Sequence, residues 1–117
     1  MANDIRGEVG FRALGKDWIM KLGNGAVRSV EAETGKSFAQ VGAELADEAK
    51  ASITLLTQVF RAALEQHQPG VSMEECDSVI DEIGHAQVGD LLGKAVKLMQ
   101  PKTAKGGDTR PRKATAA

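Results

Sequence analysis

The sequence predicts a mainly helical α+β domain, in which an N-terminal two-stranded β-hairpin is followed by about five short helices and a disordered basic tail. Three observations lead to this prediction. Apolar and polar residues alternate on both sides of a Gly-Lys pair near the N-terminus, which is typical of a hairpin. Beyond this segment, apolar residues recur at helical spacing between Ser or Asn caps and Gly or Pro stops. The last 17 residues contain no large apolar side chain.

The hairpin is predicted from "GEVGFRAL" and "DWIMKLG", two strands joined by the two-residue loop "GK". A Gly at the first loop position suits a type II′ turn, which sets the register by pairing Leu14 with Asp17. This register places three apolar pairs on one face: Ala13 with Trp18, Phe11 with Met20, and Val9 with Leu22. Because an isolated two-stranded ribbon is marginally stable, we expect that face to lie on helices. We expect the outer edges to stay open for pairing with another chain.

The helices are predicted from their caps and their apolar stripes. Asn24 is the expected cap of the first helix, Ser37 of the second and Ser52 of the third, while the S-x-x-E pattern from Ser72 to Glu75 opens the fourth. The last helix is expected from about Ala86 to residue 100, before Pro101. The expected inward-facing residues are Val27, Val30, Phe38, Val41, Leu45, Ile53, Leu56, Val59, Phe60, Ala63, Leu64, Met73, Cys76, Val79, Ile80, Ile83, Val88, Leu91, Leu92, Ala95 and Met99.

The stretch "VEAETGKS" ends like a phosphate-binding loop, but the resemblance is partial. A P-loop needs Gly at the position that Val30 occupies, since the backbone must curl around the phosphates. The motif should also follow a strand, and here it follows a predicted helix. We therefore interpret Gly35 as the left-handed residue that ends one helix, and Ser37 with Gln40 as the capping box of the next.

Composition and charge predict two parts, a folded domain over residues 1–100 and a disordered basic tail over 101–117. The domain holds 10 basic and 15 acidic residues, whereas the tail holds five basic and one acidic. The tail is interpreted as a solubilising extension, with an arm for nucleic acid or an acidic partner as the alternative. The absence of a secretion signal and of a membrane-spanning apolar run favours a cytoplasmic protein.

No set of residues indicates catalysis or metal binding. His67 and His85 are separated by 18 positions, and Cys76 lies on an apolar stripe, so no paired ligand spacing occurs. We predict a structural cysteine and surface histidines, and we expect neither an active site nor a cofactor. The carboxylates of the fourth helix, which are interpreted as a solvated face, are Glu74, Glu75, Asp77, Asp81 and Glu82.

Three segments carry a resemblance to a known family. They are "RGEV" at residues 6–9, "GAVRSVEAETG" at 25–35 and "HQPGVSMEECDSVIDEIG" at 67–84, and their order and spacing count for more than any one of them. Over residues 5–100 the chain resembles the small tail proteins of gene transfer agents and long-tailed phages, which are placed among tail assembly chaperones and also labelled tail tube proteins. The segment "LGN" at 22–24 and the basic tail depart from this resemblance.

The resemblance implies a tail assembly chaperone, working in the host cytoplasm, that binds the tape measure protein and helps recruit tail tube subunits. A tape measure protein exposes long apolar helical stripes, and several copies of a small subunit with helix-lined grooves would shield them. The implied partners are therefore the tape measure protein, the tail tube protein and further copies of this chain, without a membrane or nucleic acid. A structural component of the tail itself is the nearest alternative.

Small residues in the last predicted helix are the candidate contact site. Ala86, Gly89 and Gly93 form a strip beside the apolar face, where another helix can approach closely. The alternative is that these residues admit a neighbouring helix of the same chain.

A small DNA-binding regulator is a second alternative, because helix, Gly84, helix resembles a helix-turn-helix and the tail is basic. The acidic first helix of this pair, and a second helix that starts with Gln87 and Asp90 and no Arg, argue against it.

Overall fold

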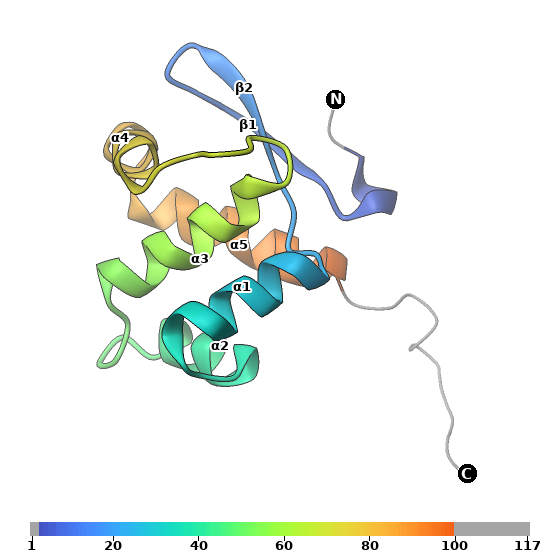
Figure 1. Cartoon of the computed structure of the whole chain (residues 1–117). Coiled ribbons are helices and arrows are strands. Elements are labelled where there is room, and N and C mark those ends of the chain that lie inside the picture. The colour runs from blue at the N-terminus through green and yellow to red at the C-terminus, as the bar shows by residue number, and fades with distance from the viewer. Residues whose placement is uncertain (1–2, 100–117) are drawn as a thin grey trace, which may run out of the picture.

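The structure, a computed structural model, describes residues 3–99 and confirms the mainly helical α+β architecture (Figure 1). The hairpin comes first and five helices follow. The elements are a 3-10 turn η1 (Asp4–Arg6), β1 (Val9–Ala13), β2 (Lys16–Met20), α1 (Asn24–Thr34), α2 (Phe38–Ala46), α3 (Ile53–Glu65), α4 (Met73–Ile83) and α5 (His85–Met99). The basic tail predicted for residues 101–117 lies outside the described residues.

The helix boundaries follow local capping chemistry. Ser37, Ser52 and Ser72 each accept a hydrogen bond from the backbone N–H three residues on, as expected of N-caps. At Ser72 the reciprocal bond from its backbone N–H to the Glu75 carboxylate completes the predicted capping box. Gly35 ends α1 with a φ of 72°, the left-handed conformation that glycine adopts without strain.

Two local predictions are wrong at helix starts. The N-cap of α1 is Gly23, whose missing side chain makes no capping bond, so Asn24 is the first helical residue. Gln40 makes no reciprocal capping bond, because its side-chain amide donates to Glu44. The last helix begins at His85, within one residue of the predicted start, and Gly84 alone links it to α4.

The hairpin register differs from the prediction by two residues. The loop is Leu14-Gly15, both with positive φ (53° and 74°), which makes a type I′ turn in place of the type II′ turn. Arg12 then lies opposite Asp17 and forms an ion pair at 2.9 Å, and the Leu14 N–H donates to the Glu82 carboxylate of α4. Because a shift of two keeps every side chain on its face, the predicted apolar face is retained.

The hairpin packs on the helices through this apolar face. It contacts α3, α4 and α5, and Figure 1 shows it at one end of the domain with α4 beside it. Trp18 and Met20 are fully buried there, and the Trp18 indole N–H donates to the Ala13 carbonyl. The hairpin therefore closes the core at this end. The other buried apolar residues are Val9, Ala13, Leu22, Val30, Val41, Leu55, Val59, Phe60, Ala62, Ala63, Leu64, Val71, Cys76, Val79, Ile80, Val88, Leu92 and Ala95.

The two hairpin edges are not equally open, which corrects the expectation that both are free. On β2, the Gln68 side chain donates to the Ile19 carbonyl and accepts from the Ile19 N–H. The Lys21 N–H, just beyond β2, donates to the Ala63 carbonyl of α3 at 2.8 Å. Most of the β2 edge is thus closed from within the chain.

Candidate functional site

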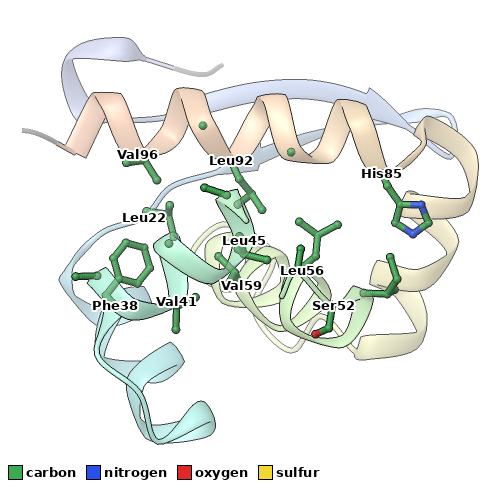
Figure 2. A pocket seen from close by; sticks show the side chains of 17 residues that line it. Leu22, Phe38, Val41, Leu45, Ser52, Leu56, Val59, His85, Leu92 and Val96 are labelled. Carbon is green, nitrogen blue, oxygen red and sulfur yellow. The ribbon is translucent and has the colours of Figure 1, made fainter. Parts of the chain in front are cut away.

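An apolar groove of about 610 Å³ lies between α5 on one side and α2 with the start of α3 on the other (Figure 2). We call it the α2–α5 groove. Figure 2 shows side chains from all three helices pointing into the space between them. Its large apolar lining residues are Leu22, Phe38, Val41, Leu45, Ile53, Leu56, Val59, Leu92 and Val96.

The floor and the rim of the groove differ in burial. Leu22, Val41 and Val59 are buried and belong to the core. Phe38, Leu45, Leu56 and Val96 pack against that core and are only half-buried. Ile53, which was expected to face the core, is 57% exposed at the rim. It lies in the first turn of α3, which extends beyond the helices packed on the rest of α3. An exposed apolar surface that joins the core is typical of a binding site.

Glycines line both walls of the groove. Gly89 and Gly93 lie one turn apart on α5, and Gly42 lies on α2. A Cβ atom built on any of the three meets no heavy atom within 4 Å. Within residues 3–99, therefore, no neighbouring helix exploits the small size of these residues.

The predicted strip is only partly in the groove. Gly89 and Gly93 line it, whereas Ala86 is exposed on α5 and is not among the lining residues. Gly42 was missed by sequence reasoning. Its signal was available, because it is a small residue directly after Val41 on the apolar side of a predicted helix.

The two polar side chains of the groove supply no catalytic arrangement. The Ser52 hydroxyl accepts the Leu55 N–H as the cap of α3, and His85 is exposed at the first turn of α5. Among residues 3–99, no group of three or more His, Cys, Asp or Glu residues is placed to hold a metal ion. The chemistry that the groove offers is apolar contact.

Cys76, predicted to be structural, is fully buried in α4. Burial away from water raises the pKa of its thiol to about 11, although the nearby Arg61 cation opposes the shift. A protonated, enclosed thiol is unreactive.

His67 is not the surface residue that was predicted. Its Nε2 atom is buried and lies 3.3 Å from the carboxylate of Glu8, itself only 5% exposed. The contact lacks hydrogen-bond geometry. It is therefore a close contact between two polar groups that are largely shielded from solvent. It joins the start of β1 to the segment between α3 and α4. His85, by contrast, is exposed as predicted.

The other sequence motifs have structural roles. In "GKS", Gly35 and Ser37 are helix punctuation as predicted, and the Lys36 ammonium group donates to Glu44 at 2.8 Å. The acidic residues of α4 are exposed, yet Glu75 caps the helix and Glu82 binds the hairpin tip. These two are therefore more than a solvated face.

The α4–α5 junction differs from a DNA-reading motif. A helix-turn-helix joins its helices by a turn of three to four residues, whereas Gly84 alone separates α4 from α5. The face of α5 that carries Val88, Leu92 and Ala95 is buried in the core.

Among the described residues, no helix is both long and apolar enough to cross a bilayer. When the chain was compared with models of protein families, with curated proteins and with solved structures, none of the three comparisons returned a match.

Proposed function

We propose that this chain is a tail assembly chaperone of a phage or gene transfer agent, which binds an apolar helix of the tape measure protein in the α2–α5 groove and helps recruit tail tube subunits. The observation that carries the proposal is the apolar groove with three glycines whose Cβ directions open into empty space. The resemblance of residues 5–100 supports the identity of the partners, which the chain would meet in the host cytoplasm.

A helix is the occupant that fits the groove best. Amphipathic helices bind in apolar grooves through large side chains spaced three and four residues apart. Gly89 and Gly93, one turn apart, let the backbone of a second helix come close to α5, and Gly42 gives the same freedom on the opposite wall. The rim residues Phe38, Leu56 and Val96 would flank the bound helix.

Co-expression with the tape measure gene of the same phage or gene transfer agent tests the proposal. The wild-type chain should keep that product soluble and co-purify with it. The double variant Gly89→Leu with Gly93→Leu should fold, because both positions face open space, but its leucines should fill the groove and abolish co-purification. Gly25→Leu is the matched control, since Gly25 also faces open space on a helix but lies outside the groove.

Different results would contradict the groove as the binding site and the chaperone function itself. If the double variant is folded by circular dichroism and still co-purifies with the tape measure product, the groove is not the binding site. If the wild-type chain neither solubilises nor retains that product, the chaperone function itself is wrong. Finding the chain as a stoichiometric part of purified particles would favour the alternative of a structural tail component.

A further inference from the structure

Within residues 3–99, the outer edge of β1 presents two successive outward positions for backbone pairing, Gly10 and Arg12. Gly10 pairs with Ile19 and Arg12 with Asp17 across the hairpin. The Ile19 N–H and carbonyl bind the Gln68 side chain, so Ile19 and Gly10 form a non-hydrogen-bonded pair whose peptide groups point outward. Because this pattern alternates, the peptide groups of Arg12 point outward as well. Among residues 3–99, no turn, loop or cap bond uses the N–H of Gly10 or Arg12, and both residues are exposed.

This open stretch of β1 has closed ends. On one side the Glu8 N–H donates to the Asn3 carbonyl at 2.9 Å, and on the other the Leu14 N–H donates to Glu82 at 2.6 Å. On the opposite hairpin edge, Ile19 is occupied by Gln68, which among residues 3–99 leaves Asp17 as the open outward position. Natural proteins close strand edges against unwanted pairing. In the part of the chain that the structure describes, β1 keeps two successive outward positions open.

We propose that a second copy of this chain pairs with β1 through this edge, in an antiparallel arrangement about a two-fold axis. When Gly10 of each copy lies opposite Arg12 of the other, both positions become hydrogen-bonded pairs, and all the free N–H and carbonyl groups of the two residues are satisfied. Any longer pairing would require the N–H groups of Glu8 and Leu14, which are already bonded. The open stretch is therefore complementary to itself.

The side chains agree with this register. Phe11 lies at the centre, so the two Phe11 residues face each other in the close, non-hydrogen-bonded pair. Phe11 is half-buried, and its ring packs beside Trp18 and Phe60, leaving part of its surface available. Gly10 has no side chain to collide with Arg12 of the second copy, whose charge is already balanced by Asp17 at 2.9 Å. No residue of β1 lines the α2–α5 groove, so the two surfaces can be tested separately.

Gly10→Pro tests the proposal by removing one outward N–H. Proline is tolerated on an edge strand where its nitrogen faces away from the ladder, so the hairpin should remain folded. The full-length wild-type chain should reach twice its 12.4 kDa mass by light scattering as concentration rises, while Gly10→Pro should stay at the mass of one chain. Asp17→Pro removes an outward N–H from β2 and also breaks the ion pair with Arg12, whereas Asp17→Ala breaks the ion pair alone. These two variants are the matched controls, and they should associate equally.

Amide exchange of the wild-type protein tests the same idea without a substitution. The amide protons of Gly10 and Arg12 should exchange more slowly as protein concentration rises, while that of Asp17 should not change. Equal exchange of the three amides at every concentration, or an unchanged dimer mass in a folded Gly10→Pro variant, would overturn the proposal.

Discussion

The two ends of helix α3 carry one continuous apolar stripe but meet different surroundings. At the C-terminal end, Phe60, Ala63 and Leu64 are completely buried beneath the hairpin. At the N-terminal end, Ile53 is 57% exposed and Leu56 lines the α2–α5 groove. The residue types are similar, so the difference lies in what the rest of the chain supplies as cover. One half of the stripe is therefore core, and the other half is available as a binding surface.

The largest contrast should appear when each end of α3 is truncated. Phe60→Ala leaves a cavity in the core, and we expect a loss of about 3–5 kcal/mol in the free energy of unfolding. Ile53→Ala, on the same helix, should cost less than about 1 kcal/mol, because its side chain is largely in water already. Urea unfolding monitored by circular dichroism measures both. Similar losses for the two variants would mean that the two ends are equally closed.

The second-largest effect should be on thiol reactivity, which distinguishes the buried side of α4 from the exposed α2–α5 groove. At pH 8, Cys76 should react with iodoacetamide roughly a hundredfold more slowly than a cysteine introduced by Gly93→Cys, because the Cys76 pKa is about 11 and a free thiol has one of about 8.5. Peptide mass mapping after timed quenching gives both rates in one sample. Rapid modification of Cys76 in the folded protein would show that α4 opens readily.

The same pKa shift links stability to pH. A folded-state pKa raised above the unfolded value favours the protonated thiol in the folded protein. Its contribution to stability is therefore complete below about pH 8.5 and is lost as pH rises through about 11. Cys76→Ala should remove this part of the alkaline destabilisation in thermal melts.

A smaller effect should come from the contact between Glu8 and His67. His67→Ala removes the imidazole that lies 3.3 Å from the buried Glu8 carboxylate. Because the contact lacks hydrogen-bond geometry, we expect a loss of about 1 kcal/mol. His85→Ala is the control, and as an exposed position it should change stability by no more than about 0.5 kcal/mol. Equal melting temperatures for the two variants would indicate that the buried contact contributes nothing.

The smallest effect should come from the groove glycines, and its sign is opposite. Gly89→Ala and Gly93→Ala should each raise stability by up to about 1 kcal/mol, since alanine favours helix and the added Cβ meets nothing within 4 Å. Gly84→Ala should destabilise the protein instead, because Gly84 has a φ of 91°. Thermal unfolding distinguishes the two signs. Destabilisation by Gly93→Ala would mean that the α5 wall of the groove is not open.

Local residue chemistry alone determined the order and most boundaries of the elements. Ser52, Ser72 and Gly35 act on backbone groups within a few residues, so the boundaries that they set could be predicted from local sequence. Alternation likewise determined which face of the hairpin is apolar, because side chains change face with every residue. Gly89 and Gly93 were also identified as a small-residue strip, since the helical period places them together.

Tertiary structure decided the features that depend on residues far apart in the chain. The type I′ register is accompanied by the bond from Leu14 to Glu82, and the β2 edge is closed by Gln68, 49 positions after Ile19. The exposure of Ile53 and the open space beside Gly93 depend on where α2 and α5 end relative to α3. Periodicity shows that a surface is apolar, but only the packed chain decides whether that surface is covered.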